Sequence, residues 1–439
     1  MIILPSLEIV PAKYNGNILL SQIPVNGTGD FTVSRALNTA TRVNSLGNIE
    51  LVNADTPRID YLTSSGTVGC PALLVEPSAQ NLALQSSDYS LTWLAASVNS
   101  TSGVLSPSGT NDATLFEATV NTARVRQTIT LTSGTTYTFS LFGKFGSLSS
   151  GFTMNVFDEN SITYANGVCQ AFNLNEGTLG ASGTAGSGFT LQSVGMENYG
   201  NGWYRCRMTV LMSYTPTTPR VGFRIGTQIS VARPLSVVSG TVNVWGAQLE
   251  VGSVATSYIP TTTAAVTRNA EVVSVSGAVS GSIGQTEGTI YAEVDIRNAA
   301  LGSILTIDDG DTTDFISIIK NSNLPIRARI RRAGGTIVNI ITSTAVSLGV
   351  HKIALGYTNG NYALYIDGSL AGTSTNSTDY PATSLTQCTL SNANYGPFND
   401  RIRAAALYTT RLTNTQLALL TSPYTSYSSM ASALSYTLG

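Results

Sequence analysis

The chain contains 439 residues, enough for two or three domains that each bury a hydrophobic core. Only 11% of the residues are charged and the formal net charge is −2, which excludes the basic surface that a nucleic-acid-binding protein needs. No run of about 18 apolar residues occurs, which excludes a membrane-spanning helix. Frequent Gly, Tyr and β-branched residues instead predict an all-β protein with uncharged polar surfaces.

Residues 1–80 show few periodic strands and are predicted to form an irregular N-terminal region for attachment or oligomerisation. The chain opens with a set of apolar side chains: Ile2, Ile3, Leu4, Leu7, Ile9 and Val10. These side chains pack either under their own domain or against another chain, and the second alternative underlies a predicted homotrimer. The stretch lacks a basic segment and a cleavage site and contains Pro5 and Glu8, so we do not expect a signal peptide.

Residues 81–268 carry regular strand signals and are predicted to form a first β-sandwich. Alternating strands flank a turn at Ser133-Gly134, and Asn201-Gly202 marks a second hairpin turn. Many short strands joined by turns, with almost no helix, are typical of a jelly roll.

The last strand of this region contains Trp245 and ends at Gly252-Ser253, and Pro260 forbids a central strand beyond it. A simple alternation places five side chains on one face: Asn243, Trp245, Ala247, Leu249 and Val251. Trp245 is therefore predicted to lie in the core beside Ala247 and Leu249.

Residues 269–425 are predicted to form a second sandwich. "TIYAEVDIRN" and "IRARIRR" alternate apolar and polar residues, and Asn359-Gly360 marks a hairpin turn. A single helix is expected after Thr413, a predicted N-cap with Gln416 three residues on. The tail, 426–439, is of low complexity, although its spaced Met430, Leu434 and Leu438 could pack between subunits.

Two stretches carry resemblances to known families. "TPRIDY", "PALLVEPSAQNLALQSSDYSLTW", "NGWYRCRMTV" and "WGAQLEVGSVATSYIPTTTAAVTRNAE" together resemble a module of tailed-phage virion proteins, which has a carbohydrate-binding-module-like sandwich. "GTIYAEVDI", "HKIALGYTNGNYALYIDGSLAG" and "RIRAAALYTTRLTNTQLALL" look like a laminin-G or concanavalin A-like jelly roll.

The resemblance implies a structural protein of the phage virion: a head fibre, decoration protein or tail fibre. Such a protein would be made in the host cytoplasm, contact capsid or tail proteins through its N-terminal region, and present its sandwiches to cell-surface glycans. A glycan-cleaving depolymerase and a bacterial surface adhesin remain as alternatives.

Catalytic residues are sparse, and we expect no enzyme activity. Glu293 and Asp295 begin the paired-carboxylate pattern of concanavalin-type glycanases, but Arg297 or Asn298 stands where the acid is required. His351 is the one histidine, and no G-x-S-x-G motif accompanies it.

Candidate binding residues fall into three groups. Aromatic and basic side chains that could contact sugars are Trp203, Arg205, Tyr357 and Tyr365. Four carboxylates in one loop, the ligands that Ca²⁺ prefers, are Asp308, Asp309, Asp311 and Asp314; a solvated acidic turn is the alternative, and no other cofactor is expected. Arg327, Arg329 and Arg331 share one strand face, which is either a solvated outer face or a surface for anionic glycans.

Overall fold

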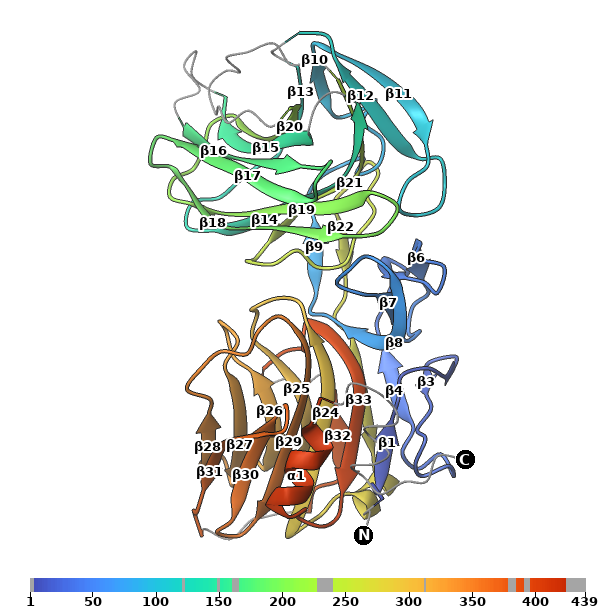
Figure 1. Cartoon of the computed structure of the whole chain (residues 1–439), viewed down its shortest axis with the longest axis vertical. Helices are drawn as coiled ribbons and strands as arrows, with labels where there is room; N and C mark the ends of the chain where they lie inside the picture. Colours follow the sequence, from blue (N-terminus) through green and yellow to red (C-terminus); the bar gives the residue numbers. More distant parts are fainter. Residues whose placement is uncertain are drawn as a thin grey trace.

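A computed structural model shows a nearly all-β chain that is elongated and built from two stacked β-sandwiches (Figure 1). The structure describes residues 4–120, 123–147, 151–159, 166–226, 240–311, 313–377, 384–390 and 395–423. In that part of the chain, no helix is long and apolar enough to cross a membrane. The fold class predicted from the sequence is confirmed.

The first sandwich consists of two six-stranded antiparallel sheets around one hydrophobic core. The strands of one sheet are, in spatial order, β10 (Leu94–Ala96), β13 (Arg124–Thr128), β20 (Pro219–Ile225), β15 (Gly151–Asp158), β16 (Asn166–Asn173) and β17 (Thr178–Ala185). Those of the other are β11 (Val98–Val104), β12 (Ala113–Ala118), β21 (Thr241–Val251), β14 (Thr136–Ser147), β19 (Trp203–Met212) and β18 (Phe189–Asn198).

Glycine-containing turns close the predicted hairpins of this sandwich. Asn201 and Gly202 have φ values of 51° and 78° between β18 and β19, and positive φ at both positions is what a tight hairpin turn requires. Beyond the turn, Cys206, Met208 and Val210 enter the core as the alternation predicts. The sequence therefore sets both the turn and the register of this hairpin.

A β-bulge in β21 changes the predicted position of Trp245. Ser140 pairs with Gln248 and Phe142 pairs with Trp245, so β21 uses three steps where β14 uses two. Gly246, at φ 65°, is the residue at which the extra step occurs. The prediction that Trp245 shares a face with Ala247 and Leu249 is wrong, because the bulge turns Trp245 to the opposite face of the sheet.

The second sandwich is larger and also consists of two antiparallel sheets. One contains β31 (Ser369–Ser374), β30 (Tyr362–Ile366), β29 (Gly349–Thr358), β24 (Glu287–Ile296), β33 (Asp400–Tyr408), β8 (Val68–Val75) and β7 (Ile59–Leu62), with β1 (Leu7–Ile9) also paired to β33. The other contains β2 (Tyr14–Asn15), β3 (Ile18–Leu19), β4 (Phe31–Ser34), β23 (Val272–Ser276), β32 (Gln387–Thr389), β25 (Gly302–Asp308), β26 (Phe315–Lys320), β27 (Ile326–Arg332) and β28 (Gly335–Ile341).

The N-terminal residues belong to these two sheets and do not form a separate unit. β1 pairs with β33, β4 with β23, and β8 with β33. Leu7 and Ile9 are buried in the core of the second sandwich, whereas Leu4 and Val10 remain exposed. The expectation that Leu7 and Ile9 pack against another chain is therefore corrected, because their own sandwich covers them; Ile2 and Ile3 lie outside the described residues.

Two small sheets occupy the waist between the sandwiches (Figure 1). One is the hairpin of β5 (Ala40–Val43) and β6 (Ile49–Val52). The other pairs β9 (Ala79–Asn81) with β22 (Val266–Arg268), the two segments in which the chain passes from one sandwich to the other. The waist is thus built from segments far apart in sequence.

Two short helices accompany the strands of the described residues. The 3-10 helix η1 (Ala278–Ser282) follows β23. Helix α1 (Asn414–Thr421) has the predicted capping box, in which Thr413 Oγ1 accepts from Gln416 N and Thr413 N donates to Gln416 Oε1. Its Leu417 packs on the outer side of the sheet that contains β29 and β30. The low-complexity tail lies outside the described residues.

Candidate functional site

The four residues predicted to contact sugars are all buried. Trp203 is 3% exposed, Arg205 3%, Tyr357 1% and Tyr365 7%. Tyr357 donates its hydroxyl to Gly284 O at 2.7 Å inside the second core. A sugar needs an accessible ring face or donor, so the expectation of sugar contact at these four side chains is corrected.

Trp203 and Arg205 do share a face, but that face is turned toward the waist. Trp203 packs with Phe142 and Trp245 in an apolar cluster that also takes in Val43 of the β5–β6 hairpin. The Arg205 guanidinium donates to Thr256 O at 2.6 Å and to Ser140 Oγ at 3.0 Å. These side chains thus hold the hairpin and the inter-domain segment against the first sandwich.

The acidic loop does not assemble a metal site among the described residues. Asp308 and Asp314 are buried, Asp311 is exposed, and no group of three potential ligands converges in the part of the chain that was placed. Asp308 Oδ1 accepts from Gly310 N at 2.9 Å, and Asp309 Oδ2 accepts from Thr313 Oγ1 at 3.3 Å. The predicted calcium site is corrected, because the carboxylates stabilise the turn itself.

His351 stands between a serine and an aspartate, yet the geometry is not that of a catalytic triad. Its Nδ1 faces Asp367 Oδ2 at 2.6 Å, and its Nε2 faces Ser347 O at 2.9 Å. Both partners are acceptors, so both ring nitrogens must donate, and the hydrogen bond to Asp367 raises the pKa of His351. A protonated imidazole cannot act as a general base toward Ser347.

The carboxylates on β24 are each held by an arginine. Glu293 Oε1 lies 3.3 Å from Arg403 Nη1, and Asp295 Oδ2 lies 2.7 Å from Arg297 Nη2. Arg297, which stands where a glycanase has its acid, is thus the partner of the carboxylate before it.

A network of buried charges crosses the waist, and most of its members come from the motifs of the phage-type resemblance. Glu271 pairs with Arg58 at 2.7 Å and with Arg35 at 3.3 Å. Glu76 pairs with Arg58 at 2.8 Å and with Arg268 at 3.0 Å. All five side chains are at most 4% exposed. We call these residues the junction network.

The junction network keeps its charges in the folded state. The contacts with Arg268 and Arg58 lower the pKa of Glu76 despite its burial, and Ser257 adds hydrogen bonds from its backbone N at 2.7 Å and its Oγ at 2.6 Å. The coulombic attraction of Glu271 and Glu76 likewise outweighs burial and raises the pKa of Arg58. Motif residues that looked functional in the sequence thus hold the two sandwiches together.

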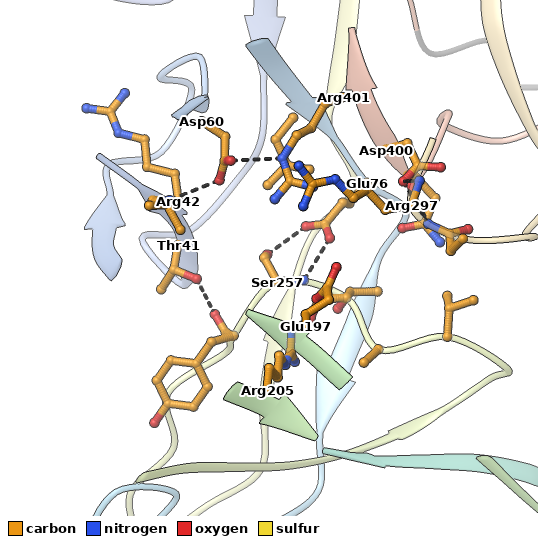
Figure 2. Close-up of a pocket in the computed structure, with 18 of the residues that line it drawn as sticks. Thr41, Arg42, Asp60, Glu76, Glu197, Arg205, Ser257, Arg297, Asp400 and Arg401 are labelled. Carbon is orange, nitrogen blue, oxygen red and sulfur yellow. Dashed lines mark hydrogen bonds and ion pairs between the residues drawn. The ribbon is translucent and has the colours of Figure 1, made fainter. Parts of the chain in front are cut away.

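A small cavity of about 60 Å³ opens beside this network (Figure 2). It is lined from both sandwiches, and Asp60, which accepts from Arg401 Nε at 2.8 Å, lies on one side. Glu197 and Arg207 line the other side. Within the described residues neither of these two side chains has a hydrogen bond or a close ion pair, although their charges attract one another. We call this cavity the junction pocket.

A second, wider opening lies next to the junction pocket and has a volume of about 490 Å³. It is lined by turns from both sandwiches: Leu46–Gly47, Ser65–Val68 and Asn198–Gly202, together with Tyr204. Tyr199 lines both openings. We call this opening the waist groove; nothing in the sequence marks it, because its three turns are distant along the chain.

The arginine side of β27 forms a polar surface on the second sandwich. Ile326, Ala328 and Ile330 enter the core, which confirms the predicted alternation. Arg327 Nε donates to Asn339 Oδ1 at 2.6 Å, and Arg329 Nη2 donates to Thr336 Oγ1 at 2.7 Å. A sequence-based alternation was therefore sufficient to find this face.

An aromatic pair supports the same surface. The Arg329 guanidinium donates to the Tyr395 hydroxyl and lies 5.9 Å from the Tyr395 ring centroid and 6.0 Å from that of Phe315. Arg327 and Arg329 have only neutral hydrogen-bond partners within the described residues. We call Arg327, Arg329, Thr336, Asn339 and Tyr395 the arginine face.

Comparisons with known proteins support the fold of the C-terminal half. Residues 268–418 match the family model described as the concanavalin A-like lectin/glucanases superfamily, so the second sandwich is a concanavalin A-like jelly roll. No curated protein sequence matches the chain.

Solved structures match only parts of the chain. The CBM40 of a Ruminococcus gnavus IT-sialidase is 16% identical, with a TM-score of 0.29 over 33% of this chain and 87% of that one. A pentraxin from Limulus polyphemus is 13% identical, with a TM-score of 0.26 over 30% and 69%. The receptor-binding domain of a botulinum neurotoxin C/D mosaic is 11% identical, with a TM-score of 0.29 over 34% and 40%.

Proposed function

We propose that the protein binds glycans through the arginine face and does not cleave them. The observation that carries the proposal is a half-exposed pair of arginines with neutral partners, Arg327 and Arg329, on a concanavalin A-like sandwich. Guanidinium groups without a bound carboxylate can form paired hydrogen bonds with the carboxylate or sulfate of a ligand. The preferred ligands are therefore glycans with acidic groups.

The aromatic support of the arginines fits this role. Phe315, 1% exposed, and Tyr395 lie against the Arg329 guanidinium, which holds it in one orientation without neutralising its charge. Burial lowers the pKa of Arg327, but arginine remains protonated at neutral pH. A fixed and charged donor loses less entropy on binding than a free side chain.

Binding without cleavage is supported by the ion pairs on β24. A retaining or inverting glycosidase needs two carboxyl groups that are free to exchange protons with the substrate. Glu293 and Asp295 instead face Arg403 and Arg297, and a guanidinium cannot protonate a leaving oxygen. A depolymerase would need a carboxyl pair elsewhere.

We further propose that the chain is a structural protein of a phage virion, carried as a head fibre, decoration protein or tail fibre. The order of the motifs that now make up the junction network supports this proposal, as does the uncharged polar composition. A homotrimer remains part of the proposal, with the exposed Leu4 and Val10 as the apolar residues left to join subunits. A bacterial adhesin with the same two sandwiches is the alternative.

Two experiments test these proposals. On a glycan array we expect acidic glycans to bind the intact chain and to be lost with Arg329→Ala, while Lys13→Ala, which removes an exposed charge elsewhere, keeps them. Equal binding by the intact chain and Arg329→Ala would remove the arginine face as the site. Negative-stain imaging of phage particles with an antibody to the chain should label the virion; unlabelled particles would favour the adhesin.

A further inference from the structure

We infer that the waist groove and the junction pocket together form a second binding site, for neutral oligosaccharides. The inference extends glycan binding to a region that is shared by both sandwiches and separate from the arginine face. It is carried by the size of the groove, by polar groups left without partners, and by the absence of net charge along its described lining.

The waist groove has the dimensions of a ligand site. Its volume of about 490 Å³ lies within the roughly 300–1,000 Å³ of pockets that hold small ligands. The junction pocket, about 60 Å³, continues it past Tyr199. Burial raises the pKa of Tyr199 to about 12, so its hydroxyl stays protonated at the point where the two openings meet.

The lining of the waist groove offers donors and acceptors without charge. Asn198 Oδ1 accepts from Gly200 N at 2.8 Å, and its Nδ2 has no partner among the described residues. The Asn201 amide and the Tyr204 hydroxyl likewise have no hydrogen bond within that part of the chain. Ser65 and Thr67 supply hydroxyls on the opposite wall, 3.0 Å apart. Sugar hydroxyls both donate and accept, so such a lining suits them.

The groove is held open by tight contact between two turns. A Cβ at Gly66 would lie 2.3 Å from Asn198 Oδ1, and a Cβ at Gly200 would lie 2.6 Å from Gly66 O. Both glycines also have positive φ, 76° and 80°. Their lack of side chains therefore lets the turn of the first sandwich lie directly on the turn between β7 and β8, which preforms the groove.

The junction pocket supplies the strongest hydrogen-bonding groups of this site. Glu197 is an acceptor and Arg207 a donor, and neither has a hydrogen-bond partner among the described residues. Gly195 makes room for the guanidinium, because a Cβ there would lie 2.6 Å from Arg207 Cζ. The two formal charges cancel, and the Glu197 carboxylate would repel an acidic group. A hydroxyl-rich neutral sugar can use both side chains at once.

The test uses the full chain and a panel of gluco- and galacto-configured neutral trisaccharides, followed by saturation-transfer NMR and titration calorimetry. We expect Glu197→Gln to weaken neutral trisaccharide binding about tenfold or more, because it replaces a charged acceptor. Tyr204→Phe, which removes only a hydroxyl, should weaken it several-fold. Glu176→Gln, an exposed glutamate away from the groove, is the matched control and should bind as the intact chain does.

The outcomes separate this site from the arginine face. Loss of neutral binding in Glu197→Gln and Tyr204→Phe, with Arg329→Ala unchanged, supports the waist site. Neutral binding that falls only with Arg329→Ala overturns it, as does an intact chain that binds acidic glycans and no neutral trisaccharide; in both cases the proposed function stands. A chain that binds no glycan of either class overturns both proposals.

Discussion

The arginines of the junction network and those of the arginine face have opposite surroundings. Arg58 is fully buried and pairs with two carboxylates, whereas Arg329 is half-exposed and contacts a hydroxyl, an aromatic pair and no carboxylate among the described residues. A buried, fully paired guanidinium cannot bind a ligand without leaving its partners uncompensated. The partners of an arginine therefore separate a structural role from a binding role, which residue type alone does not do.

The largest expected effect tests the structural side of this comparison. Glu271→Gln should lower the free energy of unfolding by about 3–5 kcal/mol, because it leaves Arg35 and Arg58 buried with reduced compensation. Urea unfolding measures it, with Glu176→Gln as an exposed control that should shift by less than about 0.5 kcal/mol. A loss below about 1 kcal/mol for Glu271→Gln would mean that the junction network does not hold the sandwiches together.

The bulge that turns Trp245 toward the waist gives the next largest effect. Gly246→Ala places a Cβ 2.8 Å from Phe142 Cδ2 at a positive φ. Gly134→Ala has a similar φ, 76°, and open space around it. We expect the first change to cost at least about 1 kcal/mol more than the second, because strain and a clash add. Equal melting temperatures for the two variants would contradict the bulge geometry.

A smaller, pH-dependent effect comes from His351. Its folded pKa is raised by Asp367, so the ion pair stabilises the folded state fully below the unfolded pKa of about 6.5. This contribution is lost as the pH rises through the higher folded pKa. Urea unfolding from pH 5 to 9 should show that decline, by under about 1 kcal/mol, and His351→Gln should remove it. A stability that rises over this range only in the intact chain would reverse the assigned sign.

The smallest expected effect concerns the acidic loop. A chelator should leave the melting temperature of the intact chain unchanged, because Asp308 and Asp309 accept hydrogen bonds from their own turn. Thermal unfolding with and without added Ca²⁺ measures it. A melting temperature that rises with Ca²⁺ and returns with Asp311→Asn would restore the calcium site.

Local patterns in the sequence were sufficient for much of the fold. Alternation gave the core side of β27, and the Asn201-Gly202 pair gave its hairpin, since each depends on residues close together in the chain. The position of Trp245 failed because one bulged residue reverses every side chain beyond it. Gly246 within a strand was the available signal.

The candidate sites were harder to predict than the fold. Trp203 and Arg205 were placed on the correct face, but their burial depends on the β5–β6 hairpin, which lies more than a hundred residues earlier in the chain. Arg58, Glu76 and Glu271 carry a family resemblance in sequence, and only their pairing shows that they are structural. The waist groove, made by three separate turns, has no sequence pattern at all.

Titration calorimetry of a polyuronate oligosaccharide tests the central claim most directly, namely that the arginine face binds acidic glycans. The intact chain should bind with an affinity that falls as salt is added, since the contact is between charges. Arg327→Gln/Arg329→Gln should abolish the binding heat while its melting temperature stays close to that of the intact chain. Unchanged binding by this double variant would contradict the account and place the glycan site elsewhere on the molecule.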